Sequence, residues 1–163
     1  MKKAVFLDRD GVINEDSGYV SKISDFKFIN GVFEALSGFK KLGYLLIIVT
    51  NQSGIARGFY TLDDFEKLNK FMLDEFTKNG VFIDKVYFCP HSPEENCECR
   101  KPKAGMILQG LKEFDINPQN SILIGDKISD IEAANAANLG CAYQIGKDGG
   151  SLREIYEIIK EKL

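Results

Sequence analysis

Two carboxylates directly follow an apolar run near the start of the chain. Residues 4–7 are Ala, Val, Phe and Leu, and they are followed by Asp8, Arg9, Asp10 and Gly11. An apolar run of this length that ends in polar residues is typical of a buried strand in a parallel sheet. Ligands of such sheets bind beyond the carboxyl ends of the strands. Asp8 and Asp10 are therefore predicted to lie at a ligand-binding edge.

Two later apolar runs, at residues 44–49 and 121–124, also end in polar residues, and a basic pair precedes a predicted helix. These polar and basic residues are Thr50, Asn51, Asp126, Arg100 and Lys101. We expect them to gather with Asp8 and Asp10 at one edge of the sheet. Crowded carboxylates repel one another unless a hard cation shares them, and Mg²⁺ commonly bridges carboxylates to a phosphate. The pattern predicts a site for magnesium and phosphate.

Such a site favours phosphoryl chemistry with two carboxylates in different roles. One carboxylate can attack phosphorus and form an aspartyl-phosphate. A second carboxylate, two residues further on, can protonate the leaving alkoxide and later deprotonate water. Taken alone, Asp8 and Asp10 fit a solvated turn after a strand about as well. The other strand-end residues are what favour a reaction centre.

Strands and helices alternate along the chain. The predicted strands cover residues 4–7, 44–49, 83–88, 121–124 and 141–145. The predicted helices run from a cap at Asn30 to Gly43, from a capping box at Thr61 and Asp64 to Gly80, from Ala104 to a stop before Asn117, from Ser129 to Gly140, and over residues 151–163. Residues 13–30 are expected to form a loop or flap over the strand edge. This order predicts one α/β domain over residues 1–163, with a Rossmann-like parallel sheet and helices on both faces.

Composition limits the class of protein. The chain has 163 residues, of which 44% are hydrophobic and 28% charged, which suits a single globular domain with a core. A net charge of -3 gives no general attraction to nucleic acid or to anionic lipid. The first apolar run is broken at Asp8, too early for a signal peptide or a membrane span. We expect a cytoplasmic protein with no nucleic-acid or membrane partner.

Three cysteines and the only histidine crowd into one loop. Cys89, His91, Cys97 and Cys99 form a Cys₃His set with short spacings, whereas Cys141 lies apart. In a reducing compartment such crowding favours a metal over disulfides, and four protein ligands suit a structural, tetrahedral zinc ion. The alternative is an ordinary polar loop with incidental thiols. Cys141 is expected to be a small, buried strand residue.

Four short motifs occur in order along the chain, namely FLDRDG at residues 6–11, VTN at 49–51, KP at 101–102 and IGDKISD at 124–130. Together they resemble the signature motifs of the haloacid dehalogenase superfamily of phosphatases. The resemblance covers nearly the whole chain. Within that superfamily, the string TNQSGIARG at residues 50–58 and the cysteine loop resemble the zinc-containing branch that acts on heptose bisphosphates and histidinol phosphate.

The resemblance implies a role for each matching residue of the centre. Asp8 is expected to be the nucleophile and a Mg²⁺ ligand, and Asp10 the general acid and base, which also offers its backbone carbonyl to the metal. Asp126 is expected to be a further Mg²⁺ ligand. Thr50 and Lys101 are expected to hold the phosphoryl oxygens. Asp130 stands four residues after Asp126, where a helix would place both on one face, and is expected to support the site.

The resemblance also implies a set of residues that contact the sugar or its second phosphate. They are Asp16, Ser17, Gly18, Tyr19, Asn51, Gln52, Ser53, Arg100 and Lys127. Arg100 is the candidate for the second phosphate, because a guanidinium fork binds phosphate through two hydrogen bonds. The cysteine loop is expected to hold structural zinc and so to fix Arg100 and Lys101. The chain has no room for a large cap domain, so the site is expected to be open.

The implied function is a Mg²⁺-dependent phosphatase that removes the 7-phosphate of D-glycero-D-manno-heptose 1,7-bisphosphate, for lipopolysaccharide or surface-polysaccharide precursors. Histidinol phosphate or another sugar phosphate is the alternative substrate, and the enzyme is expected to be a monomer. A phospho-accepting signalling domain also uses strand-end acids, Mg²⁺ and a lysine. Asp10 argues against this alternative, because it is placed to hydrolyse an aspartyl-phosphate at Asp8. A zinc-organised module for nucleic acid is disfavoured by the acidic charge.

Overall fold

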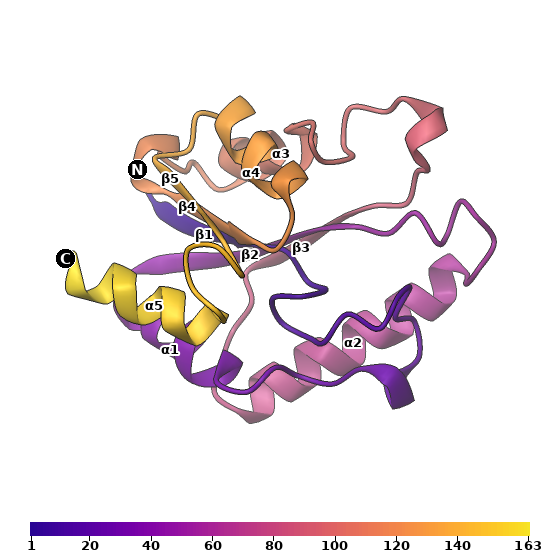
Figure 1. Cartoon of the computed structure of the whole chain (residues 1–163), viewed down its shortest axis with the longest axis horizontal. Helices are drawn as coiled ribbons and strands as arrows, with labels where there is room; N and C mark the ends of the chain where they lie inside the picture. Colours follow the sequence, from indigo (N-terminus) through magenta and orange to yellow (C-terminus); the bar gives the residue numbers. More distant parts are fainter.

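The computed structural model describes residues 1–163 as a five-stranded parallel sheet with helices on both faces (Figure 1). The strands are β1 (Lys3–Leu7), β2 (Tyr44–Asn51), β3 (Lys85–Cys89), β4 (Ile122–Gly125) and β5 (Cys141–Gln144). The helices are α1 (Val32–Lys41), α2 (Leu62–Lys78), α3 (Gly105–Glu113), α4 (Ile128–Ala136) and α5 (Leu152–Glu161). Short 3₁₀ helices cover Ile23–Asp25, Pro93–Glu95 and Pro118–Asn120. The predicted α/β architecture without a large cap is confirmed.

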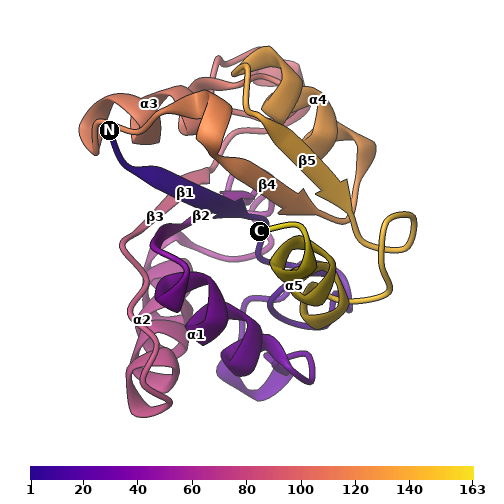
Figure 2. The same ribbon diagram turned by 90° about the vertical axis from the view of Figure 1, so that its left-hand side faces the viewer.

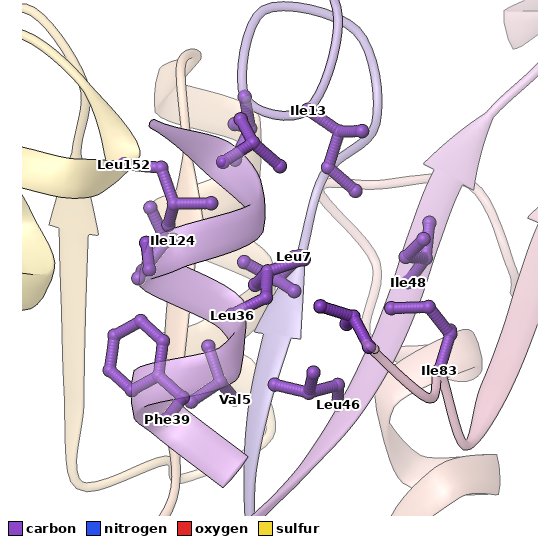
Figure 3. Packing of buried hydrophobic residues seen from close by; sticks show 14 of the residues in the cluster. Val5, Leu7, Ile13, Leu36, Phe39, Leu46, Ile48, Ile83, Ile124 and Leu152 are labelled. Carbon is purple, nitrogen blue, oxygen red and sulfur yellow. The ribbon is translucent and has the colours of Figure 1, made fainter. Parts of the chain in front are cut away.

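Both faces of the sheet are buried, which explains why its central strands are apolar without a break. Successive residues of β1 point to opposite layers, as the two-residue period of a strand requires. Val5 and Leu7 belong to the larger core cluster, which includes residues of α1, α2 and α5, whereas Ala4 and Phe6 belong to a smaller one with α3 and α4. Figure 2 shows these two helical layers, and Figure 3 shows Val5 and Leu7 close to Leu36 of α1.

The strand order β3-β2-β1-β4-β5 places the reversal of the chain at β1. The chain first runs outward from β1 through β2 to β3, and then returns to place β4 on the other side of β1. In open α/β sheets ligands bind at this switch point, beyond the carboxyl ends of the strands. The loops that follow β1, β2 and β3 lie on the right side of Figure 1, and both ends of the chain lie on the left.

Two helix starts show what local sequence does and does not determine. The capping box of α2 is confirmed: Thr61 Oγ1 accepts a hydrogen bond from the Asp64 amide at 3.0 Å, and Asp64 Oδ2 accepts one from the Thr61 amide at 2.9 Å. The predicted cap of α1 at Asn30 is wrong. Gly31 occupies that position with φ of 88°, a left-handed conformation that favours glycine.

The last strand corrects a further expectation. The predicted burial of Cys141 is wrong: its side chain is exposed, because β5 is an edge strand that pairs only with β4. The strand pattern at Cys141 indicates the element correctly, but the position of that element in the sheet depends on the order of all five strands. None of the helices is both long and apolar enough to cross a membrane.

Candidate active site

Asp8 lies directly beyond the end of β1, at the switch point of the sheet, and is 8% exposed. Lys101 reaches it from the loop after β3. The Lys101 ammonium donates to Asp8 Oδ1 at 3.0 Å, to Asp130 Oδ1 at 2.6 Å and to the Val49 carbonyl at 2.8 Å. Lys101 is 4% exposed, so this cation is fixed between two carboxylates in a nearly dry site.

Burial and charge act in opposite directions on these groups. Burial raises the pKa of Asp8 to about 8, and the neighbouring charge of Asp130 adds to this rise, whereas Lys101 opposes it. Burial alone would lower the pKa of Lys101, but the carboxylates of Asp8 and Asp130 outweigh it and keep that pKa above its usual value. Lys101 therefore remains a cation, and the carboxylate of Asp8 is costly to ionise without a second positive charge.

A third carboxylate completes the acidic cluster. Asp8, Asp126 and Asp130 each offer an oxygen, and these oxygens lie within 4.8 Å of one another. Asp126 Oδ1 is buried and has no hydrogen-bond partner, and burial raises the pKa of Asp126 above its usual range. A buried carboxylate oxygen without a donor is the kind of ligand a divalent cation uses. This corner of the site fits Mg²⁺.

The position of Asp130 has a different cause from the one predicted. Asp126 precedes α4, so the two residues do not share a helix face. Asp130 lies in the first turn of α4, where its Oδ2 accepts a hydrogen bond from the Lys127 amide at 3.1 Å and its Oδ1 accepts from Lys101. It is 1% exposed and belongs to the cluster itself.

Asp10 is surrounded by donors that the sequence motifs do not single out. Its Oδ1 accepts hydrogen bonds from Arg9 Nε at 3.1 Å, from Arg9 Nη2 at 3.0 Å and from Asn14 Nδ2 at 2.9 Å. Arg9 is 2% exposed and is the largest of the fully buried side chains. Its position between two acids gives no sign of such burial. No sequence period indicates the burial of Arg9, because β1 ends at Leu7 and Arg9 lies beyond the strand.

The residues after β2 contribute in two different ways. Asn51 exchanges two hydrogen bonds with the backbone of Lys101, at 3.1 Å and 3.2 Å, and so joins the end of β2 to the loop after β3. Thr50 and Gln52 are buried, and Gln52 Nε2 donates to Thr50 Oγ1 at 2.9 Å. Gln52 Oε1 accepts a hydrogen bond from the Tyr60 hydroxyl. The amide of Gln52 is thus engaged within the protein.

A cavity of about 550 Å³ opens above these residues. The predicted site residues that line it are Asp8, Asp10, Asp16, Gly18, Tyr19, Asn51, Ser53, Arg100, Lys101 and Lys127, with Asp130. Those that do not line it are Ser17, Thr50, Gln52 and Asp126. Sequence reasoning missed four lining residues, Arg57, Pro93, Pro102 and Ser129. Arg57 belongs to the TNQSGIARG string, so its place in that motif is the available signal.

The lining is strongly polar and carries three cations besides Lys101. Arg57, Arg100 and Lys127 all reach the cavity, and Arg100 Nη1 is buried without a hydrogen-bond partner. An unpaired buried guanidinium nitrogen is costly unless an anion completes it. The cavity therefore combines an acidic centre at Asp8 with several cations, among them Arg100.

The four residues of the cysteine loop point at one another. Cys89, His91, Cys97 and Cys99 place their ligand atoms within 4.8 Å of one another, with separations such as 3.4 Å from Cys89 Sγ to His91 Nδ1 and 3.5 Å from Cys89 Sγ to Cys97 Sγ. All four cysteines of the chain are free thiols. Burial acts to raise the pKa of Cys97, but hydrogen bonds from the Arg100 backbone and from Cys89 outweigh it and lower that pKa to about 6. The lowered pKa favours the thiolate, which is the form that metals bind.

The doubly wound sheet and the acidic centre at its switch point are typical of α/β proteins that bind phosphate and a divalent cation. A sequence profile described as haloacid dehalogenase-like hydrolase matches residues 10–143, and the chain belongs to this family. The resemblance predicted from the four motifs is confirmed.

Several similar proteins are named as phosphatases of heptose bisphosphates. The D-glycero-alpha-D-manno-heptose-1,7-bisphosphate 7-phosphatase of Campylobacter jejuni is 52% identical, over 98% of this chain and 97% of its own length. The D-glycero-beta-D-manno-heptose-1,7-bisphosphate 7-phosphatase of Helicobacter pylori is 55% identical, over 80% of this chain and 76% of its own. The crystal structure of the D,D-heptose 1,7-bisphosphate phosphatase from B. bronchiseptica, in complex with magnesium and phosphate, has a TM-score of 0.87 and is 26% identical, over 99% of both chains.

Proposed function

We propose that this chain is a Mg²⁺-dependent phosphatase that removes the 7-phosphate of D-glycero-D-manno-heptose 1,7-bisphosphate through an aspartyl-phosphate at Asp8. The observation that carries the proposal is the buried contact of Asp8 with Lys101 beside the crowded acids of the switch point. The similarity to heptose bisphosphate 7-phosphatases, which covers nearly the whole chain in one relative, supports the choice of substrate. The product would supply lipopolysaccharide or surface-polysaccharide precursors.

Magnesium fits the acidic cluster of Asp8, Asp126 and Asp130 beside the cavity. Asp8 and Asp126 would hold the ion through their carboxylates, and Asp10 would add its backbone carbonyl. When bound, Mg²⁺ offsets the negative charge of the carboxylates and of the phosphoryl oxygens that meet there. The unpartnered Asp126 Oδ1 is the feature of this chain that supports the assignment.

The residues of the chain divide the reaction between them. Lys101 holds a phosphoryl oxygen next to Asp8, and Thr50 lies at the end of β2 where it can donate to another. Asp8 attacks phosphorus while Asp10 gives a proton to the departing sugar oxygen, which leaves an aspartyl-phosphate. Asp10 then takes a proton from water, whose oxygen attacks phosphorus and releases inorganic phosphate and the Asp8 carboxylate.

The cations of the cavity lining would select a substrate with a second anion. Arg100 has a buried nitrogen without a partner, and Arg57 and Lys127 line the same cavity. We assign the remaining phosphate to Arg100 and the sugar hydroxyls to the polar lining. The residues proposed for the sugar are Asp16, Ser17, Gly18, Tyr19, Asn51 and Ser53, with Lys127. Gln52 takes part through Thr50 and Asp10, because its own amide is engaged within the protein.

The cysteine loop is proposed to hold one structural zinc ion. A Cys₃His set with all four positions filled by protein leaves no open position for chemistry. Lys101 stands two residues after Cys99, and the Asn51 side chain holds its backbone from the other side. Zinc would thus fix the cation that contacts Asp8.

A comparison of kcat/KM on heptose 1,7-bisphosphate and histidinol phosphate tests the substrate. We expect a preference for the heptose of at least about tenfold, with Asp8→Asn inactive on both. A preference for histidinol phosphate would overturn the choice of substrate. A lasting phosphoprotein without phosphate release would instead favour a signalling domain. We further propose a cytoplasmic monomer, and cell fractionation and light scattering of the purified protein check these two points.

A further inference from the structure

Arg9 is a buried cation beside the candidate reaction centre, and neither phosphate binding nor the metal uses it. Its guanidinium contacts Asp10 through three hydrogen bonds, two to Oδ1 at 3.0 and 3.1 Å and one to Oδ2 at 3.3 Å. Burying a guanidinium is costly unless a partner with good geometry compensates for the lost water. The planar fork of arginine meets a carboxylate edge in this way, whereas a lysine would offer a single point charge.

The two oxygens of Asp10 are left in different states. Oδ1 accepts two hydrogen bonds from Arg9 and a third from Asn14 at 2.9 Å, so its acceptor capacity is used. Oδ2 has only the 3.3 Å contact with Arg9 and a 3.5 Å contact with Gln52. The Asp10 side chain is 21% exposed and lines the cavity. The oxygen that remains free to carry a proton toward a substrate is therefore Oδ2.

The same guanidinium also holds the loop over the cavity. Arg9 Nη2 donates to the Val20 carbonyl at 2.9 Å, directly after the stretch whose Asp16, Gly18 and Tyr19 line the cavity. On its other sides Arg9 lies 5.9 Å from the ring centroid of Phe26 and 6.0 Å from that of Phe65 on α2. These aromatic rings limit the positions that the guanidinium can take.

We propose that Arg9 is a positioning residue that orients Asp10 so that Oδ2 carries the proton of the reaction. The inference rests on the proposed function, in which Asp10 is the general acid and base. In the first step the proton on Oδ2 passes to the bridging oxygen as the P–O bond to the sugar breaks and the Asp8–phosphorus bond forms. In the second step Oδ2 takes a proton from the water that attacks phosphorus. No other side chain gains or loses a proton in these steps, and Arg9 stays charged throughout.

A purely structural role for Arg9 predicts a different pattern of loss. If Arg9 only supports the fold, its substitution lowers activity equally on all phosphate esters. If Arg9 orients the general acid, the loss depends on how much the leaving group needs a proton. A sugar alkoxide needs one, whereas nitrophenolate is a far weaker base and leaves without help. The kcat/KM value reports the steps up to departure of the leaving group, so it isolates the acid role.

The experiment measures kcat/KM of the Mg²⁺-loaded enzyme on the heptose bisphosphate and on p-nitrophenyl phosphate. We expect Arg9→Gln to lose about 10²-fold on the sugar phosphate, the lower end of general-acid effects, and less than about threefold on the aryl ester. Arg9→Lys keeps the charge without the fork and is expected to lose about tenfold on the sugar phosphate alone. Lys67→Gln, at an exposed helix pair, is the control with unchanged kinetics.

Asp10→Asn separates a failure of this inference from a failure of the proposed function. Asp10→Asn is expected to show the same selective loss, and the double variant with Arg9→Gln should lose little more than Asp10→Asn alone. If Asp10→Asn lowers kcat/KM equally on both substrates, the acid role of Asp10 is wrong. If Asp10→Asn lowers kcat/KM mainly on the sugar phosphate, but both Arg9 variants lower it equally on both substrates, Arg9 only supports the fold. If thermal unfolding shows that Arg9→Gln does not fold, Arg9→Lys alone decides.

Discussion

Burial strongly affects the pKa of the Asp8 carboxyl group. Its pKa is raised from 3.8 to about 8, first by burial and then by the charge of Asp130. Between about pH 4 and pH 8 the folded, metal-free protein keeps a proton on Asp8 that the unfolded chain has released. The unfolded state binds fewer protons in this window, so the free energy of unfolding falls as pH rises through it and levels off above about pH 8.

Asp8→Asn should therefore stabilise the metal-free protein, and the gain should grow with pH. Asparagine has no charge to bury, and Lys101 keeps its contact with Asp130. We expect the Tm difference from the wild type to be small at about pH 5 and to reach a few degrees by about pH 8.5, since 1 kcal/mol moves the Tm of a domain this size by about 2–4 °C. Scanning calorimetry in EDTA across this range checks it. A gain that is constant with pH would contradict the raised pKa.

Gly11→Ala should damage the acidic corner without unfolding the protein. Gly11 has φ of 87°, and a Cβ there would overlap the Asp126 carboxylate, which would have to move. We expect a loss of about 1–2 kcal/mol in stability from the left-handed backbone, and a Mg²⁺ concentration for half-maximal activity that rises at least about tenfold. Urea unfolding and a Mg²⁺ titration of activity measure both.

Gly80→Ala is the matched control for Gly11→Ala. Gly80 has φ of 73°, but a Cβ there would meet nothing within 4 Å. The two variants share the backbone strain, and only Gly11→Ala adds the overlap with Asp126. If both variants change the Mg²⁺ titration equally, the overlap is irrelevant to the metal.

The single residues of the site are predictable from sequence to different degrees. Asp8 and Asp126 stand at or just after the ends of apolar runs, so the ends of the predicted strands are enough to place them. Arg9 escapes notice because charge normally indicates exposure, and only the packing of α2 and the loop around it makes its burial possible. Gln52 is predicted to touch substrate, but the Tyr60 hydroxyl, which lies outside the motif, engages its amide.

Elements are predictable where local chemistry determines them. Apolar runs, continuous in β1, β2 and β4 and interrupted in the stretches predicted for β3 and β5, indicate the strands, and the capping box fixes the start of α2. The start of α1 at Gly31 depends instead on a left-handed backbone, and a Cβ there would also press on the Arg153 side chain of α5. The exposure of Cys141 likewise follows from strand order. The periodicity of a sequence does not predict the contacts between elements that are distant along the chain.

The contact of α1 with α5 gives a prediction at this level. A Cβ at Gly38 would overlap the ring of Tyr156. That ring packs edge-on against Phe39, with 5.0 Å between the two ring centroids. Gly38→Ala should destabilise the fold by about 1–3 kcal/mol through overpacking. Tyr156→Leu should relieve part of this, so a double-mutant cycle by urea unfolding should give a favourable coupling. Additive effects would show that the helices move apart freely, and kcat is expected to stay unchanged in every variant.

The whole molecule joins two kinds of support, an apolar core under the sheet and a polar loop after β3 that has little core of its own. Residues 92–100 are half-buried or exposed, yet this stretch leads directly to Lys101, which is 4% exposed. The Cys₃His cluster brings four side chains of the cysteine loop together. A metal there would therefore stabilise the loop much more than the sheet.

Removal of zinc should lower activity before it lowers global stability. We expect about one equivalent of zinc in protein purified without added metal, and its loss in Cys97→Ala. That variant should lose at least about tenfold in kcat/KM, because Arg100 and Lys101 lose their anchor, with a smaller change in Tm. Elemental analysis, kinetics and calorimetry measure the three quantities. Cys141→Ala, an exposed thiol outside the cluster, is the control. Full zinc content in Cys97→Ala would contradict the site.

Both ends of the chain lie on the side of the sheet away from the loops that surround the cavity (Figure 1). A tag, a second enzyme or a solid support joined at either end would point away from incoming substrate. The geometry therefore suits this domain to fusion at its N-terminus, at its C-terminus or at both. Immobilised or fused forms should keep the kcat/KM of the free enzyme without the help of a long linker.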